Sequence, residues 1–255
     1  MTEQLRLNRF LATAGVASRR RCDELIQEGR IHVNGERVSQ LGTRVDPSAD
    51  EVVLDGVRVE LPQEQWTLVL HKPREVLVAA RDERGRKTVM DLLQGFPGRV
   101  FPVGRLDYRS EGLLLFTNDG ELAYRLAHPR FKVDKVYLVE VEGSVAPAVV
   151  DELRRGVTLE DGVTQPAEVR TLKKRHGHTY LEIRLREGRK RQIRRMLALF
   201  GHEVIRLKRV RFGPVLLESL AAGDWRELGD KEVQALRREV GLDPEGGSAA
   251  AEGQS

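Results

Sequence analysis

One acidic residue in this chain stands where catalytic carboxylates are often found. Asp107 ends the stretch Gly104-Arg105-Leu106-Asp107, between the apolar runs 100–103 and 113–116. Such runs predict buried strands, and a strand–loop junction holds a side chain on a rigid scaffold while leaving it open to a ligand. A carboxylate there can act as a nucleophile or as a general base. The position equally suits an acid that only begins a turn or pairs with Arg105, because structural ion pairs are common.

Positive charge is concentrated in the second half of the chain. Residues 173–211 contain fourteen Lys or Arg and three Glu, a net charge of +11, whereas the whole chain carries +4. A block of one sign favours a polyanionic partner, and nucleic acid is the commonest. The alternative is a solvated face laced with salt bridges.

Several other classes of protein are disfavoured by composition. Cys22 is the only cysteine, so the chain suits a reducing compartment. The polar start lacks the apolar core of a signal peptide, and no stretch approaches the roughly 20 apolar residues of a membrane span. There is no Gly-rich phosphate loop or nicotinamide fingerprint, and His176 and His178 lack the Cys or carboxylate neighbours of a metal site. We expect a soluble, cytoplasmic monomer without membrane contact, metal or cofactor.

The elements that must position Asp107 are mostly strands. Hydrophobic alternation predicts strands at 66–70, 135–141 and 204–212, with two more inside 168–186, and helices at 121–128, 147–155 and 230–240. Many strands with few helices indicate an α+β domain on a mixed, largely antiparallel sheet. The polar, Pro-containing stretch 61–65 marks a boundary. The predicted domains are residues 1–62 and 63–242, followed by a disordered tail over 243–255.

The N-terminal segment predicts two short helices followed by a hairpin. Ser18 is a predicted N-cap, and Arg19, Arg20 and Arg21 fill the first helical turn after it. Cations there oppose the helix dipole, so stability does not explain them, whereas contact with RNA phosphate does. Asn34-Gly35 predicts a type I′ hairpin turn. Over roughly residues 4–60 this pattern resembles the S4 RNA-binding domain, with a plain helical cap as the alternative.

The stretch around Asp107 is similar to a known motif. Gly104-Arg105-Leu106-Asp107, together with the sequence Gly-Leu-Leu-Leu-Phe-Thr-Asn-Asp-Gly at 112–120, resembles the catalytic motif of rRNA pseudouridine synthases of the RsuA/RluB type. The resemblance covers about residues 4–240. It implies that Asp107 is the essential catalytic carboxylate and that a strand tyrosine and a basic residue share its cleft. The matching positions are Tyr137 and Arg194.

The resemblance implies an isomerisation: the C1′–N1 bond of a uridine breaks, the base turns, and a C1′–C5 bond forms. A base must leave the stack to react, and Tyr137 would hold it, unless that ring is only a core residue. Arg194 would pair with Asp107 and keep it ionised, unless it contacts phosphate like its neighbours. Asp107 can attack the base, attack the sugar or remove a proton, and the sequence leaves these roles open.

The expected partner is ribosomal RNA. Four further cations are predicted to contact its backbone, namely Arg105, Lys190, Arg191 and Arg195. Ser110 stands where relatives usually carry Thr and keeps the hydroxyl. The segments 212–214 and 223–226 look more like the RluB branch, which favours 23S rRNA or a precursor ribosomal particle as substrate. The alternatives are the same chemistry on 16S rRNA, a non-catalytic S4-type rRNA-binding protein, and a nucleosidase, which would need a second acid.

Overall fold

The computed structural model describes residues 4–62 and 64–242, so the predicted tail over 243–255 lies outside the described residues. Contacts divide the chain into two compact units. The first consists of Met1–Gln65 with Asn118–Gly120, and the second of Trp66–Thr117 with Glu121–Ser255. Among the described residues, no helix is long and apolar enough to cross a lipid bilayer.

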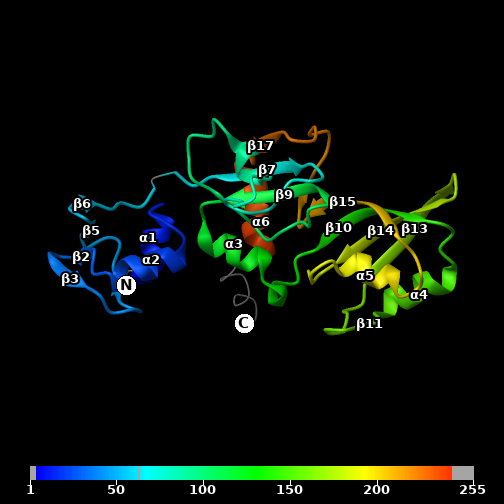
Figure 1. Ribbon diagram of the computed structural model, residues 1–255, viewed down its shortest axis with the longest axis horizontal. Helices are drawn as coiled ribbons and strands as arrows, with labels where there is room; N and C mark the ends of the chain where they lie inside the picture. Colours follow the sequence, from blue (N-terminus) through cyan, green and yellow to red (C-terminus); the bar gives the residue numbers. More distant parts are fainter. Residues whose placement is uncertain (1–3, 63, 243–255) are drawn as a thin grey trace, which may run out of the picture. The chain divides into compact units, whose positions relative to one another are not determined.

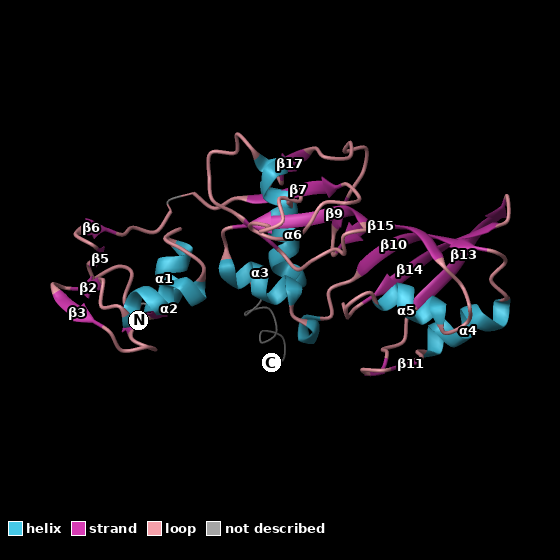
Figure 2. Cartoon of the chain, viewed as in Figure 1, coloured by secondary structure: helices cyan, strands magenta, loops and turns pink. Residues whose placement is uncertain are grey.

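The first unit consists of two short helices and small antiparallel sheets (Figure 2). Helix α2 begins where the Ser18 side chain accepts a hydrogen bond from the Arg21 N–H, as an N-cap does. The hairpin turns at Asn34 and Gly35, whose φ values of 52° and 82° fit the expected type I′ turn. The elements of the first unit are β1 (Leu5–Arg6), α1 (Leu7–Thr13), α2 (Arg19–Gln27), β2 (Ile31–Val33), β3 (Glu36–Val38), β4 (Arg44–Val45), β5 (Val52–Leu54) and β6 (Val57–Arg58).

The second unit is organised around one nine-stranded sheet (Figure 1). Its strands lie in the order β13-β14-β10-β15-β9-β7-β17, with β16 paired to β15 and β8 to β9. Among the described strands of this sheet, only β15 and β9 pair in parallel, so the predicted mixed, largely antiparallel sheet is confirmed. The bounds are β7 (Thr67–Lys72), β8 (Phe101–Pro102), β9 (Glu111–Thr117), β10 (Lys135–Glu142), β13 (Glu168–Arg175), β14 (His178–Leu185), β15 (Val204–Phe212), β16 (Val215–Leu216) and β17 (Trp225–Glu227).

Helices cover the sheet in two places, because alternate side chains of each strand point to opposite faces. Val69, Leu113 and Leu115 pack with residues of α3 and α6, whereas Leu181 and Ile183 pack with α4 and α5 (Figure 1). The helical segments are η1 (Val89–Leu93), α3 (Gly120–Ala127), η2 (Pro129–Phe131), α4 (Pro147–Arg155), α5 (Gln192–Ala198) and α6 (Asp230–Glu239). A small hairpin of β11 (Thr158–Leu159) and β12 (Gly162–Val163) precedes β13.

The parallel pair of β9 and β15 requires a glycine directly after the loop that contains Asp107. Gly112 lies opposite Arg209 and has a φ of 106°, which side chains rarely tolerate. A Cβ at this position would lie 2.2 Å from the Arg209 carbonyl oxygen. Gly112 therefore lets the first residues of β9 approach β15, and this contact positions the loop before it.

Candidate active site

A cavity of about 240 Å³ lies beside the loop that joins β8 to β9. Engineered apolar cavities of about 150 Å³ bind benzene, so this one can accommodate a pyrimidine ring. It brings together five residues that the sequence predicted for the site, namely Arg105, Asp107, Tyr137, Lys190 and Arg191. These residues come from three segments that are far apart in the chain. The remaining lining residues are Gly104, Leu106, Ser110, Leu185, Glu187, Gly188, Arg189, Gln192, Ile193 and Leu207.

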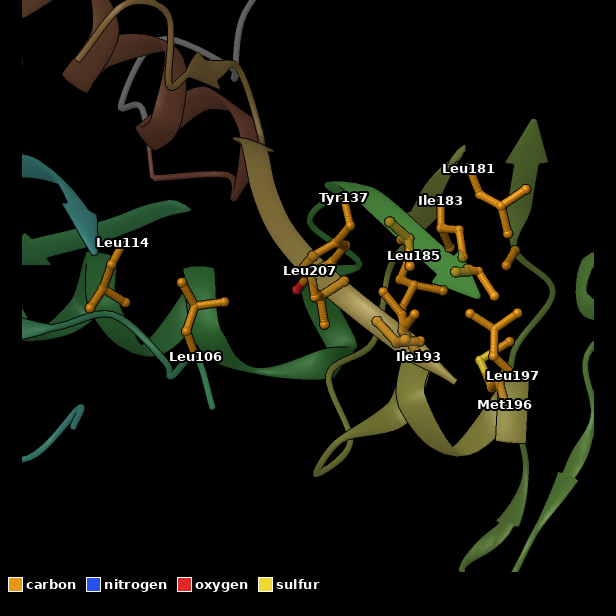
Figure 3. Packing of buried hydrophobic residues seen from close by; sticks show 14 of the residues in the cluster. Leu106, Leu114, Tyr137, Leu181, Ile183, Leu185, Ile193, Met196, Leu197 and Leu207 are labelled. Carbon is orange, nitrogen blue, oxygen red and sulfur yellow. The ribbon is translucent and has the colours of Figure 1, made fainter. Parts of the chain in front are cut away.

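Tyr137 forms part of both the cavity wall and the core. It lies on β10 opposite Ile183 of β14 and is 9% exposed. Figure 3 shows its ring beside Leu207, with Leu185 and Ile193 nearby, and all four residues line the cavity. An aromatic ring with apolar neighbours offers a flat surface that excludes water from a bound base. The two interpretations of Tyr137 from sequence are therefore compatible.

The loop that contains Asp107 is held by backbone hydrogen bonds and by one buried cation. The Ser110 N–H donates to the Asp107 carbonyl oxygen at 2.9 Å, and the Glu75 N–H donates to the Tyr108 carbonyl oxygen at 2.7 Å. Lys72, which is fully buried, donates from Nζ to the Ser110 carbonyl oxygen at 2.8 Å and to that of Pro73 at 2.9 Å. Because these bonds converge on residues 107–110, they fix where the Asp107 carboxylate is presented.

Lys72 also places positive charge in the electrostatic range of the site. Burial lowers the pKa of Lys72 to about 8, while the negative charges of Asp107 and Glu111 act in the opposite direction. Sequence reasoning did not single out Lys72 for the site. The signal that could have revealed it is a lysine at the end of the apolar strand Thr67–Lys72, all of which is buried.

Arg194 is close to the loop but does not bind Asp107 directly. Its guanidinium donates to the Val204 carbonyl oxygen at 2.6 Å and to the Arg109 carbonyl oxygen at 3.4 Å. Within the described chain, no ion pair of 4.0 Å or less joins it to Asp107. Burial lowers the pKa of Arg194 and Arg191 adds to this, while the charge of Asp107 opposes both. The expected ion pair between Arg194 and Asp107 is therefore not formed, because the guanidinium donates to backbone carbonyl oxygens instead. Membership of Arg194 in the catalytic set stays a prediction.

The basic loop 187–192 is closed by its own polar side chains. Glu187, which is 6% exposed, accepts from Gln192 Nε2 at 2.6 Å, from the Gln165 N–H at 3.0 Å and from Arg189 Nε at 3.2 Å. Gln192 Oε1 in turn accepts from the Arg189 N–H at 3.1 Å. This network leaves Lys190 and Arg191, both exposed, at the cavity. Sequence reasoning missed the part played by the two buried polar residues.

Arg195 forms an ion pair that its basic sequence neighbourhood does not predict. Its guanidinium binds both carboxylate oxygens of Asp161 at 3.0 Å, which raises the pKa of Arg195 and lowers that of Asp161. This bidentate pair fixes the β11–β12 hairpin against α5 and engages two of the donors that the expected RNA contact would use, while that contact itself stays a prediction. In the first unit, Arg19 and Arg20 are exposed, while Arg21 pairs with two glutamates of its own helix region.

A single acid of the cavity is available for chemistry. Among the described residues that line it, Asp107 and Glu187 are the only acids, and both Glu187 oxygens already accept hydrogen bonds. Two free carboxylates would be needed for glycosidic hydrolysis. One carboxylate beside an apolar wall and a basic rim instead fits covalent or base catalysis on a flipped nucleotide.

Comparison with known proteins agrees with this geometry. The family model for RNA pseudouridylate synthases matches residues 66–199, and the S4 domain model matches residues 5–53. The chain belongs to the RNA pseudouridylate synthase family. It is therefore an isomerase that acts on uridine in RNA, and its N-terminal segment is an S4 domain, as the sequence predicted. The alternatives of a non-catalytic binding protein and a nucleosidase are not supported.

Three relatives illustrate the extent of the similarity. An uncharacterised RNA pseudouridine synthase of Aquifex aeolicus is 48% identical over 94% of this chain and 96% of its own length. The ribosomal large subunit pseudouridine synthase B of Bacillus subtilis is 45% identical over 91% of this chain and 95% of its own. A crystal structure of a pseudouridylate synthase has a TM-score of 0.67 and 28% identity, and the match covers 91% of this synthase and 99% of that chain.

Proposed function

We propose that this synthase isomerises one uridine of 23S rRNA during maturation of the large ribosomal subunit. It acts in the cytoplasm as a monomer, on the free rRNA or on a precursor particle. The proposal is carried by the cavity: among the described residues that line it, Asp107 is the one acid whose carboxylate accepts no hydrogen bond, and Tyr137 belongs to its apolar wall. The choice of 23S rRNA is supported by the relative from Bacillus subtilis, which is named for the large subunit.

The proposed site divides the work among named groups. Asp107 is the nucleophile or base, and Tyr137 holds the flipped uracil while its C1′–N1 bond breaks and its C1′–C5 bond forms. The base then loses the proton from C5 and gains one at N1, so nothing is added to or removed from the RNA. Lys72 and Arg194 place positive charge within electrostatic range of Asp107, although neither forms an ion pair with it.

The remaining residues bind the RNA backbone. Arg105, Lys190 and Arg191 surround the cavity with exposed cations, which suits phosphates on either side of the flipped nucleotide. Residues 1–62 form the RNA-binding domain, where Arg19 and Arg20 present free-standing positive charge on the surface of α2. The catalytic domain covers residues 63–242.

The decisive experiment is Asp107→Asn. Asn has nearly the shape of Asp but lacks the negative charge and basicity that each of the possible roles requires. We expect no pseudouridine in a 23S rRNA transcript treated with the variant, detected by a pseudouridine-specific chemical stop in reverse transcription. The affinity for the transcript should stay within a few-fold of wild type, because the basic surface is unchanged.

Asp151→Asn is the matched control, since it makes the same chemical change on the exposed surface of α4. It should convert the transcript like wild type. Conversion by Asp107→Asn at the control rate would exclude Asp107 as the catalyst. Mapping of pseudouridine in rRNA from cells that lack the protein tests the substrate, because a missing site in 16S rRNA instead of 23S rRNA would refute the choice of subunit.

A further inference from the structure

A cluster of aromatic rings and a guanidinium group lies at the end of α3, outside the cavity. We call it the Tyr124 cluster and define it as Tyr124, His128, Arg130 and Phe131. The rings of Tyr124 and His128 are 5.2 Å apart between centroids, and those of Tyr124 and Phe131 are 6.2 Å apart. The Arg130 guanidinium lies 4.5 Å from the Phe131 ring centroid and 5.4 Å from that of Tyr124. The cation is therefore held in place by rings.

The cluster is open to solvent, unlike a core aromatic group. Tyr124 is 44% exposed, and His128 and Arg130 are exposed as well, while Phe131 packs partly against the core. His128 Nδ1 accepts a hydrogen bond from the Arg130 backbone N–H at 3.2 Å. Within the described residues, no carboxylate lies within 4.0 Å of the Arg130 guanidinium.

A neighbouring arginine shows how a structural cation differs from Arg130. Arg125 also lies over the Phe131 ring, at 5.5 Å, but it pairs with Glu121 and donates to the carbonyl oxygens of Val240 and Gly241. Its donors are therefore used inside the fold, at the end of α6. Those of Arg130 are free for a ligand, because ring contacts orient a guanidinium without using its N–H groups.

We propose that the Tyr124 cluster binds a segment of the substrate RNA that flanks the target uridine. Arg130 donates to a phosphate, and a base stacks on the exposed ring of Tyr124. RNA fits both halves of the surface, since its phosphates suit the planar fork of Arg and its bases suit an exposed aromatic face. An acidic peptide would pair with Arg130 but would leave the exposed rings without a partner.

The position of the cluster allows one RNA to reach it from the cavity. Phe131 and Tyr137 are six positions apart in the chain, a separation that spans at most about 22 Å when fully extended. Exposed Lys132 lies between them and adds a cation on that path. The flanking position rests on the proposed function, because the uridine in the cavity is the reference point.

The test compares Arg130→Gln with Arg155→Gln, an exposed arginine of α4 that makes the same change of charge. The dissociation constant for a 23S rRNA transcript is measured with the full chain across a range of salt concentrations. A lost phosphate contact should reduce the slope of log K against log salt by about 0.7 to 0.9 and weaken binding. Arg155→Gln should keep the wild-type slope, and thermal unfolding should confirm that each variant is folded.

A second pair of variants tests stacking. Tyr124→Leu should weaken transcript binding about tenfold, whereas Tyr124→Phe should bind like wild type because it keeps the ring. Unchanged affinity and slope in both Arg130→Gln and Tyr124→Leu would overturn the proposal. So would weaker binding to precursor particles with unchanged binding to the bare transcript, because the cluster would then contact protein. If wild type converts no uridine while Arg130→Gln still changes the slope, the proposed function fails and the RNA surface stands.

Discussion

Replacement of Lys72 by Met tests whether a buried cation positions the catalytic loop. Met has nearly the length of Lys and fills the same space, but it has no charge and no donor. The change removes the two hydrogen bonds from Nζ to the carbonyl oxygens of Pro73 and Ser110. It also removes the positive charge that interacts with Asp107 and Glu111.

The effect on stability is the difference between two terms of similar size. Hydrogen bonds from a charged donor contribute about 1.5–3 kcal/mol each, so two contribute about 3–6 kcal/mol. Against this, a Lys72 pKa of about 8 in place of 10.5 means that the folded protein disfavours the charged form by roughly 3 kcal/mol. Met removes that penalty. We expect Lys72→Met to lower the free energy of unfolding by about 0–3 kcal/mol in urea denaturation at pH 7.

The effect on catalysis should be larger than this modest loss of stability. Without Nζ, the Ser110 carbonyl oxygen loses its partner, and the Ser110 N–H is the group that donates to the Asp107 carbonyl oxygen. A displacement of about 1 Å at a reacting group can lower a rate about 100-fold. We expect a loss of that order in single-turnover conversion at saturating enzyme, with little change in RNA affinity.

The dependence on pH supplies a signature that a general packing defect would not give. In wild type, Lys72 loses its charge as pH rises through about 8, so the conversion rate should fall above that pH. Between pH 8 and 10.5 the unfolded state holds a proton that the folded state has released, so the free energy of unfolding rises with pH. In Lys72→Met, the conversion rate should not fall above pH 8, and the free energy of unfolding should rise less between pH 8 and 10.5. Lys135, whose pKa burial also lowers to about 8, still contributes to the rise.

Lys231→Met on the exposed side of α6 is the control for loss of one positive charge. It should match wild type in rate, stability and pH profile. A Lys72→Met enzyme with a wild-type rate and an unchanged alkaline limb would refute the positioning role.

Four further substitutions test other parts of the structure. Gly112→Ala should lower the free energy of unfolding by about 3–5 kcal/mol, since its Cβ would meet the Arg209 carbonyl oxygen at 2.2 Å and its φ is 106°; a wild-type melting temperature would contradict this. Arg194→Ala should lower the rate at saturating enzyme, whereas Arg191→Ala should chiefly weaken RNA binding, and equal rate losses would refute the distinction. Arg195→Gln should lower the free energy of unfolding and leave the salt dependence of RNA binding unchanged, because the Arg195 guanidinium is held in an ion pair. A smaller salt slope in this variant would show that Arg195 contacts RNA.

Local sequence patterns determined much of the fold and the centre of the site. Side-chain alternation identified the strand that contains Tyr137, and Asn34-Gly35 identified the hairpin of β2 and β3 in the first unit. Both signals depend only on neighbouring residues. The placement of Asp107 between two strands followed in the same way, but only β9 is buried as expected, since Phe101 of β8 is 38% exposed.

Tertiary structure alone decided the partners of the long cations. Fourteen basic side chains in residues 173–211 predicted one RNA-binding face, yet Arg195 binds an aspartate and Arg209 is buried with its Nε donating to the Leu113 carbonyl oxygen. Lys72 likewise finds its acceptor 38 residues away. A lysine or arginine has several donors on a flexible stem, so it bonds to whichever acceptor the folded chain brings near. Composition fixes how many cations the chain has, but only the packing of distant segments determines which of them stay free for RNA.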